Sequence, residues 1–410
     1  MLRRKLAALH RRIVTLLHGA WAIPTVLMIR ALRPWRVIRL GSLISGRIGH
    51  FTSDAGQQWA CRRVNPGRFI DLYWLPKVTC NAFWREMVSR HFRVHAWVRP
   101  LDQWNRLLPG GARHHRPNST TASRDVNGFL EQSPDMLPFR RDEDQWARSW
   151  LRGLGWRDGE PFVCLLVRDS AYLDSDPLHR SYAVTEDPVV GRGWRYHDYR
   201  DSDIATYVEA AEWLAAQGVW VLRMGRIMAR PMPIRHSRVI DYAFHPEKSD
   251  FLDVWLFAHC DFCITTGSGP DMVSDIYRRP LLAVPLMPLN CLWSWSDAIH
   301  VSKRLVWGAT GRPLSLRDYF DHGYGYATQY AQAGIDIHDL TPGEILAAVQ
   351  ERWQRIQGTW EETADDLDRQ RRFWAILKAH PDFHRGHGWI HPQSRAGAAW
   401  LRQMGDEFLT

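Results

Sequence analysis

Three short turns carry the residues whose types and spacing could do chemistry. They are Gly46-Arg-Ile-Gly-His50, Val167-Arg-Asp-Ser170 and Thr265-Thr-Gly-Ser-Gly-Pro-Asp271. Each turn follows an apolar run that predicts a β-strand. Parallel α/β sheets bind their ligands at the carboxyl ends of the strands. We therefore expect the three turns to border a ligand site.

The first turn suggests a catalytic base. Its glycines let the backbone approach a ligand, and the start of the following helix favours an anion. His50 titrates near neutrality and could take a proton from an acceptor hydroxyl. Asp54 is the first carboxylate of the chain and is the second candidate for this role. A tight turn whose histidine only caps the next helix fits the spacing equally well.

The other two turns suggest a site for a diphosphate. Arg168 is placed to clamp a diphosphate with two N–H groups, and Asp169 could orient it or hold a hydroxyl. A structural ion pair remains the alternative for these two. In the third turn, backbone N–H groups at 267–269 can form an anion nest directly before a helix. We assign the binding of this diphosphate, as part of a donor substrate, to seven residues. They are Arg168, Asp169, Arg223, Gly267, Ser268, Gly269 and Asp271.

Two further features are weaker. Arg200 and Asp203 become donor contacts if the loop at 174–200 folds over the donor, or they belong to a helix cap. The 22 tryptophans, including Trp293 and Trp295, suggest some sugar-stacking surfaces among a majority of core residues. The sequence has no dinucleotide or P-loop fingerprint and no paired metal ligands. We therefore predict no cofactor and no metal.

The elements that must position these residues form two series. Apolar runs alternate with helix-forming segments, which predicts βα units and parallel sheets. We expect strands at 35–40, 69–75, 93–98, 162–167, 219–223, 239–242, 261–266 and 281–284. We expect helices from residue 53 and at 81–91, 204–215, 251–258, 270–278 and 343–378, with a long loop at 109–138. The fold class is therefore α/β with two Rossmann-like domains.

The charge of the chain is concentrated near its start. The net charge is +9, and ten Lys and Arg precede Asp54, the first acidic residue. The remaining residues are close to neutral, which argues against the basic stripe of a nucleic-acid-binding protein. The apolar run at 13–29 is flanked by arginines and falls short of the ~20 residues that span a bilayer. We expect an interfacial helix, with a helix packed on its own domain and a single span as alternatives.

Domain boundaries and localisation follow from these patterns. We expect a basic amphipathic membrane-surface arm at 1–35, a first Rossmann-like domain at 36–155, a second at 156–342 and C-terminal helices at 343–410 that pack back across the domains. The six cysteines have no framework spacing and indicate reduced thiols. We therefore expect a cytoplasmic protein that is peripheral on the anionic inner face of the plasma membrane.

A series of short motifs resembles a known family. The motifs are Gly46–His50, Val167–Tyr172, Tyr199–Ile204, Val221–Gly225, Val239–Tyr242, Thr266–Pro270 and Gly386–Pro392. In this order they resemble the glycosyltransferases of bacterial surface-polysaccharide clusters, from about Val37 to the C-terminus. That family is similar in outline to GT-B enzymes, including fucosyltransferase-like ones. The resemblance implies two Rossmann-like domains with parallel sheets facing a central cleft, plus N- and C-terminal helices.

The resemblance also implies roles for particular residues. It puts Arg168, Ser268 and Gly269 on the donor side and His50 on the cleft-facing turn. By the same resemblance, 36–155 is the acceptor-side domain and 156–342 is the nucleotide-sugar domain. The fucosyltransferase pattern has a His where Leu166 stands and a Gly-Asp where Asp169-Ser170 stands, which argues against a fucose or GDP donor. The helical Glu pair of many retaining GT-B enzymes is missing, which favours inversion.

These observations predict metal-independent transfer of a sugar from a nucleotide-activated donor to a polysaccharide or lipid-linked glycan acceptor. The arginine and the helix start would neutralise the leaving diphosphate, while a base deprotonates the acceptor. Two alternatives stay open. A GT-B-like nucleotide-sugar epimerase would keep the donor pocket, and a membrane-bound scaffold would have a degenerate one.

Overall fold

The computed structural model describes residues 2–175 and 195–410, with side chains from residue 13 and, after the gap, from residue 197. The chain folds as two compact units. Unit 1 comprises residues 1–123 and 132–139, and unit 2 comprises residues 124–131 and 140–410. This division differs from the expected boundary at 155, because the helix at 141–153 and the segment 124–131 belong to unit 2.

Unit 1 is built on a three-stranded parallel sheet in the order β2-β1-β3. Its strands are β1 (Val37–Ser42), β2 (Phe69–Trp74) and β3 (His115–Arg116), and its helices are α1 (Leu2–Ala31), α2 (Ile48–Val64), α3 (Ala82–His91), α4 (Val98–Leu107) and the short η1 (Gly111–His114). A Cβ at Gly41 would collide with the Arg116 carbonyl oxygen, so glycine allows β1 to pair closely with β3.

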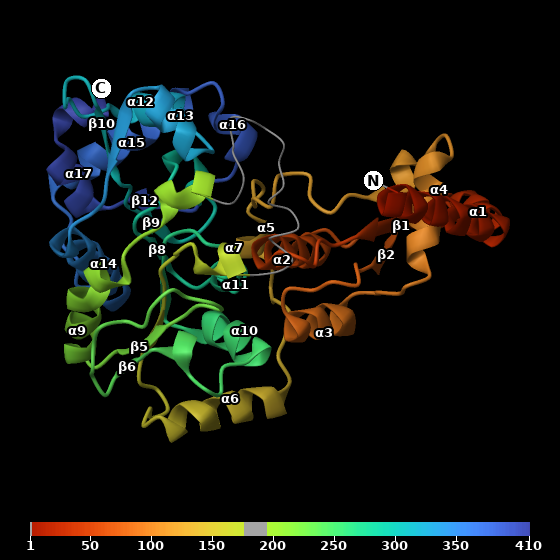
Figure 1. The fold of residues 1–410 in the computed structure, drawn as a ribbon, viewed down its shortest axis with the longest axis horizontal. Helices are drawn as coiled ribbons and strands as arrows, with labels where there is room; N and C mark the ends of the chain where they lie inside the picture. Colours follow the sequence, from red (N-terminus) through yellow and green to blue (C-terminus); the bar gives the residue numbers. More distant parts are fainter. Residues whose placement is uncertain (1, 176–194) are drawn as a thin grey trace. The chain divides into compact units, whose positions relative to one another are not determined.

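Helix α1 is part of the core of unit 1. Ala22, Val26 and Ile29 are buried against Val98 and Leu101 of α4, and Figure 1 shows the two helices side by side. A separable arm at 1–35 therefore does not describe this structure. Of the interpretations of the apolar run, packing on its own domain is observed for one face of the helix.

Unit 2 is built on a seven-stranded sheet whose named pairs are all parallel, in the order β12-β9-β8-β7-β4-β5-β6. The strands are β4 (Phe162–Leu166), β5 (Trp220–Arg223), β6 (Val239–Ile240), β7 (Phe262–Thr265), β8 (Leu281–Ala283), β9 (Ala298–His300) and β12 (Arg395–Ala396). From β4 the chain builds outward to β5 and β6, returns to the other side of β4 with β7, and continues to β8, β9 and β12. This is the doubly wound order of a dinucleotide-binding fold, extended by one strand.

Helices and an antiparallel pair complete unit 2. The pair is β10 (Arg304–Trp307) with β11 (Ile335–His338). The α-helices are α5 (Phe129–Gln132), most of which lies in unit 2, α6 (Arg141–Gly153), α7 (Ala171–Ser175), α9 (Val208–Ala216), α10 (Asp250–His259), α11 (Met272–Ile276), α12 (Leu316–Asp321), α13 (Ala327–Gln332), α14 (Pro342–Gln357), α15 (Ala364–Ala379), α16 (Phe383–Gly386) and α17 (Ala398–Met404). The 3₁₀ turns are η2 (Arg195–Arg200), η3 (Ile204–Tyr207), η4 (Tyr242–Phe244), η5 (Leu289–Cys291) and η6 (Asp406–Leu409).

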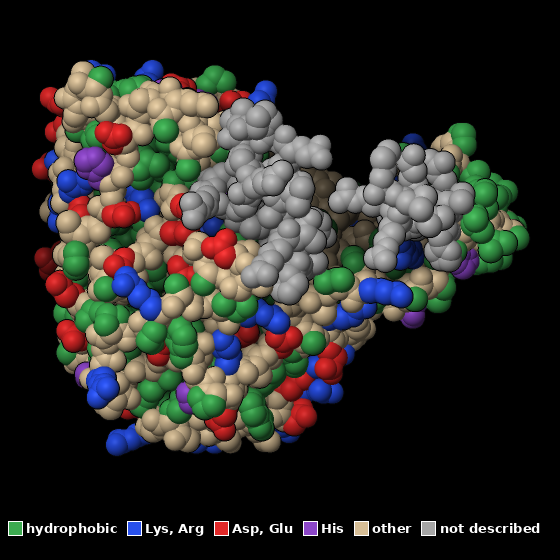
Figure 2. All heavy atoms as spheres, in the orientation of Figure 1, with side chains coloured by type: hydrophobic (Ala, Val, Ile, Leu, Met, Phe, Trp, Pro, Cys, Tyr) green, Lys and Arg blue, Asp and Glu red, His purple; other side chains and the backbone are tan. Residues whose placement is uncertain are grey.

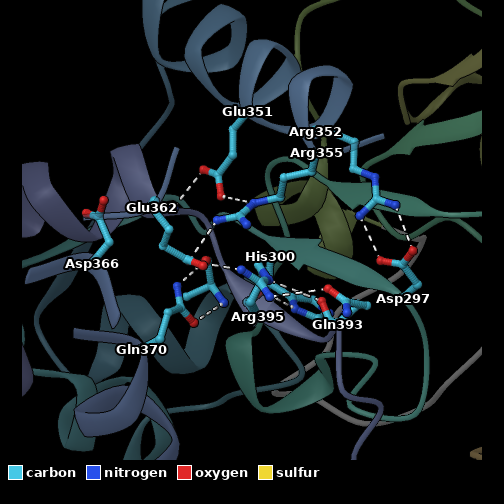
Figure 3. A network of polar contacts seen from close by, with 12 residues as sticks. Asp297, His300, Glu351, Arg352, Arg355, Glu362, Asp366, Gln370, Gln393 and Arg395 are labelled. Atoms are coloured by element: carbon cyan, nitrogen blue, oxygen red, sulfur yellow. Dashed lines mark hydrogen bonds and ion pairs between the residues drawn. The ribbon is translucent and has the colours of Figure 1, made fainter. Parts of the chain in front are cut away.

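A polar network fastens the C-terminal helices to the β12 edge of the sheet (Figure 3). Glu351 of α14 accepts from Arg355 and from the backbone of Ala398 at the start of α17. Arg355 and Arg395 both donate to Glu362, each over 3.0 Å. We expected these helices to return across both domains, whereas the structure groups them with unit 2.

The α/β class with parallel sheets is confirmed, and the differences lie at element boundaries. The expected strand at 93–98 is a single bridge from Val94 to Tyr73, because α4 already begins at Val98. The long loop at 109–138 contains η1, β3 and α5. The helical stretch at 343–378 is two helices, because Gly358 ends α14 with a left-handed φ of 71°. Trp293 and Trp295 are core residues, exposed by 7% and 4%.

Candidate functional site

The second and third predicted turns meet at the switch point of the seven-stranded sheet. The Arg168 turn leaves β4 and the Gly267 turn leaves β7, and these neighbouring strands lie where the strand order reverses. The backbone N–H of Arg168 donates to the Thr266 hydroxyl over 3.0 Å, which ties the two turns together. Ligands of doubly wound folds bind in the crevice outside this point.

Arg168 is held so that part of its guanidinium stays available. Its Nε atom donates to Asp201 over 2.7 Å, and its carbonyl oxygen accepts from the backbone N–H of Ser202. Its Nη atoms have no hydrogen-bond partner among residues 2–175 and 195–410. An arginine whose Nε is anchored by a carboxylate presents its free edge in a fixed direction, as bidentate recognition of a phosphate requires.

Arg200 adds a second positive charge at the same place. Its Nη2 atom donates to the carbonyl oxygen of Gly267, and its buried Nε atom has no partner among the described residues. Burial lowers the pKa of Arg200, and the neighbouring Arg168 guanidinium lowers it further. Two cations this close repel each other unless an anion lies between or beside them. The Arg168 and Arg200 pair therefore provides an anion-binding feature at the switch point.

The anion nest predicted at 267–269 is filled from within the chain. The backbone N–H groups of Ser268 and Gly269 both donate to the Asp271 carboxylate, each over 2.9 Å. Asp271 has no exposed surface and also accepts from the Thr265 hydroxyl. The following helix α11 has only five residues, so its start adds little dipole. Asp271 therefore shapes the turn, and the amides at 268 and 269 are not available to a donor phosphate.

Three other predicted donor residues are held by the protein itself. Arg223 is 1% exposed and pairs with Asp241 over 3.1 Å beside the Phe244 ring, which makes it a structural ion pair at the end of β5. Asp169 accepts from the backbone N–H groups of Ala171 and Ala229 and fixes two loops. Asp203 caps η3 through the Ala205 N–H and pairs with Arg230. Residues 176–194 of the loop expected over the donor lie outside the described residues.

Unit 1 brings the two predicted bases together through a serine. The Ser123 hydroxyl lies 2.8 Å from His50 Nδ1 and donates to Asp54 Oδ1 over 2.7 Å. Asn118 donates to the other oxygen of Asp54. Asp54 is 1% exposed, whereas His50 is half-buried. We call the three residues His50, Ser123 and Asp54 the unit 1 relay.

The electrostatics of the relay fix the tautomer of His50. Burial raises the pKa of Asp54 to about 6 against the hydrogen bonds from Ser123 and Asn118, so the carboxylate is mostly ionised at pH 7. An ionised Asp54 must accept from Ser123, and Ser123 must then accept from His50 Nδ1–H. Burial also lowers the pKa of His50, with Arg47 adding to the effect. Neutral His50 therefore carries a lone pair on Nε2, which has no hydrogen-bond partner among the described residues.

The relay depends on a strained segment. Ala122 and Ser123 have φ values of 52° and 63°, a region that non-glycine residues rarely occupy. The Ser119 hydroxyl accepts from the Ser123 N–H over 2.8 Å and helps to hold this conformation. Such strain costs on the order of 1–3 kcal/mol per residue and is found mostly at functional sites.

Ser123 and Asn118 were missed by the sequence analysis. They lie 69 and 64 residues from Asp54, in a segment interpreted as a loop. We expected α2 to begin at Ser53, but it begins at Ile48. Gly49 and His50 therefore lie in its first turn. The Thr52 hydroxyl donates back to the Ile48 carbonyl oxygen inside the helix.

A cavity of about 580 Å³ lies between α14 and α17, and none of the three turns lines it. Its carboxylates are already paired, Glu344 with Arg304 and Glu351 with Arg355. We therefore treat the switch point of unit 2 and the relay of unit 1 as two separate candidate sites, because each has groups that no other described residue pairs.

Comparisons with known proteins show similar solved structures only. No protein-family model matches the sequence, and no curated protein matches it. The structure of E. coli ADP-heptose lps heptosyltransferase II is 15% identical with a TM-score of 0.40, over 78% of this chain and 99% of that chain. The glycosyl transferase family 9 structure from Veillonella parvula DSM 2008 is 11% identical with a TM-score of 0.40, over 65% and 86%. E. coli heptosyltransferase WaaC with ADP is 12% identical with a TM-score of 0.29, over 64% and 90%.

Proposed function

We propose that the chain is a glycosyltransferase that moves a sugar from a nucleotide-activated donor to a glycan acceptor. The observation that carries the proposal is the Arg168 and Arg200 pair at the switch point of a doubly wound sheet. The three solved structures named above are glycosyltransferases by title.

The arginine pair suits the diphosphate of a nucleotide sugar. Arg168 offers its Nη atoms to the phosphate oxygens, and Arg200 adds charge while supporting the Gly267 turn. When the bond between the anomeric carbon and the diphosphate breaks, negative charge grows on the leaving oxygen. Fixed guanidinium groups stabilise this charge without having to reorganise. Asp201 orients Arg168 and is a positioning residue.

The unit 1 relay suits the activation of an acceptor hydroxyl. In the proposed step, His50 Nε2 accepts the proton while the hydroxyl oxygen forms the new bond to the anomeric carbon and the nucleoside diphosphate leaves. Ser123 and Asp54 hold the imidazole in the tautomer that can accept this proton. A single displacement of this kind inverts the anomeric centre. The proposal needs no metal or cofactor.

The test begins with a screen and ends with product analysis. Thermal-shift measurements with UDP-, GDP-, CMP-, TDP- and ADP-sugars identify the nucleotide that stabilises the protein. The best donor is then incubated with and without a lipid-linked glycan. The proposal expects nucleoside diphosphate to be released only with the acceptor, and NMR to show an inverted product.

Other outcomes would overturn the proposal. Isomerisation of the donor sugar without an acceptor would identify an epimerase. Absence of any stabilisation by all five nucleotide classes would indicate a scaffold without a working donor site.

A further inference from the structure

Helix α1 has two apolar faces, and only one of them is used by the fold. The inner face, with Ala22, Val26 and Ile29, is buried against α4. Gly19 lies under the Trp104 ring, where a Cβ would come within 2.7 Å of the indole. The Trp104 indole also donates to the Thr15 carbonyl oxygen over 3.0 Å. The inner face of α1 is therefore packed against α4 within unit 1.

The outer face is an exposed stripe of apolar residues. It consists of Ile13, Leu16, Leu17, Ala20, Trp21, Pro24, Leu27, Met28, Ala31 and Leu32. The spacing of three and four residues keeps them on one side of the helix over its whole described length. Leu16, Leu17 and Met28 are 68%, 71% and 59% exposed. Figure 2 shows hydrophobic side chains gathered over α1. A continuous stripe of this size marks an interaction surface.

The charges around the stripe select its partner. No acidic residue precedes Asp54, whereas ten Lys and Arg do. Arg33 and Arg36 follow the stripe and are exposed, and Arg11 and Arg12 precede it in the sequence. A long apolar stripe between basic residues fits the acyl boundary and headgroups of an anionic lipid surface. A second copy of the chain would bring the same basic residues together.

The contacts of Arg30 decide how the helix meets the lipid. Its guanidinium donates to the Asn105 side chain and to the carbonyl oxygens of Asn105, Leu108 and Pro109 at the end of α4. By length and composition Ile13–Ala31 could cross a bilayer. Crossing would require α1 to lose its packing contacts with α4. If α1 stays packed on α4, only its outer stripe is accessible to lipid.

We propose that α1 docks unit 1 on an anionic membrane by its outer stripe, lying in the plane of one leaflet while its inner face stays packed on α4. The surface does not depend on the proposed transferase activity. Docking and folding therefore use different residues of the same helix, which makes them separable by substitution.

The experiment measures binding of the full chain to vesicles of three parts phosphatidylcholine and one part phosphatidylglycerol. The test variant is Leu16→Ser/Leu17→Ser/Met28→Ser on the outer stripe. The control is Trp146→Ser/Phe244→Ser/Leu367→Ser, which removes three exposed apolar side chains from unit 2. We expect the test variant to lose at least about tenfold in partition coefficient and the control to stay within about twofold of wild type. Circular dichroism should show both variants folded.

Several results would overturn this proposal. They are unchanged binding by the test variant, equally strong binding to pure phosphatidylcholine, and resistance of the bound protein to extraction at alkaline pH, which marks a span. A stripe-dependent dimer with no vesicle binding would assign the surface to a second copy. If the test variant unfolds, the single Leu17→Ser variant gives the same comparison with a smaller expected loss of about threefold.

Discussion

The switch point of unit 2 and the relay of unit 1 are organised differently. At the switch point, neighbouring parallel strands bring Arg168 and the Gly267 turn together, and one bond from Arg168 N–H to Thr266 joins them. In the relay, His50 and Asp54 share the first two turns of α2, but the link between them comes from the strained segment at Ser123. A sheet places the first site by topology, whereas a returning loop must complete the second.

This difference predicts how each site fails. Changes at the switch point should alter donor affinity and leave the tautomer of His50 untouched. Changes in the relay should alter turnover and its pH dependence, with donor affinity preserved.

The largest expected effect is that of His50→Ala. If Nε2 is the general base, turnover should fall by roughly 10²–10⁴-fold while the Kd of the donor changes little. The wild-type rate should also fall as the pH drops through about 6, where Asp54 takes up a proton. Steady-state rates from pH 5 to 8 check both points. Near-normal turnover in the variant would show that His50 is not the general base, and Asp54 would become the candidate.

A smaller effect is expected from Ser123, because it acts through His50. Ser123→Ala and Ser123→Gly both remove the hydroxyl, so both should lose about tenfold in turnover and shift the acidic limb of the rate profile. They should differ in stability, because glycine adopts the φ of 63° without strain. We expect Ser123→Gly to be about 1 kcal/mol more stable than Ser123→Ala in urea unfolding. Equal stability would argue against the strained conformation, and a normal pH profile in both would argue against the relay.

An effect on stability alone is expected from the buried carboxyl of Asp54. Burial raises its pKa from 3.8 to about 6, so the folded state binds this proton more tightly than the unfolded state. The stabilisation is complete below pH 3.8 and is lost as the pH rises through about 6. Relative to Asp54→Asn, the wild type should therefore lose about 2 kcal/mol of unfolding free energy between pH 4 and 7.

Urea titrations at pH 4, 5, 6 and 7 measure this difference. Asp158 is a matched control of opposite sign, because the Arg152 guanidinium lowers its pKa. Relative to Asp158→Asn, the wild type should therefore lose no unfolding free energy as the pH rises from 4 to 7. Parallel curves for wild type and Asp54→Asn would mean that the carboxyl has an ordinary pKa.

The sequence predicted the elements whose signal is local. The run at 162–167 is apolar at every position, as a strand covered on both faces must be, and β4 is buried throughout. Strands β9 and β12, of three and two residues, were not predicted from the sequence. The break between α14 and α15 had a visible signal in Gly358, the residue type that most often ends a helix.

The sites divide in the same way. Arg168 and Gly267 could be predicted because strand ends are recognisable from local pattern. The filling of the Gly267 turn by Asp271 could not, because it depends on where a carboxylate three residues away points. Ser123 could not be predicted because its partner lies 69 residues earlier. The outer stripe of α1 was visible as an apolar run, but its packing on α4 was not.

The central claim is that the switch point holds the donor diphosphate through Arg168. Isothermal titration of the donor found in the screen tests it, with wild type, Arg168→Ala and the control Arg152→Ala, an exposed arginine paired with Asp158. Arg168→Ala should weaken binding by about 2–5 kcal/mol with little change in unfolding temperature, and the control should bind as wild type does. If Arg168→Ala binds the donor normally but unfolds at a lower temperature, Arg168 is a structural partner of Asp201 and the donor site lies elsewhere.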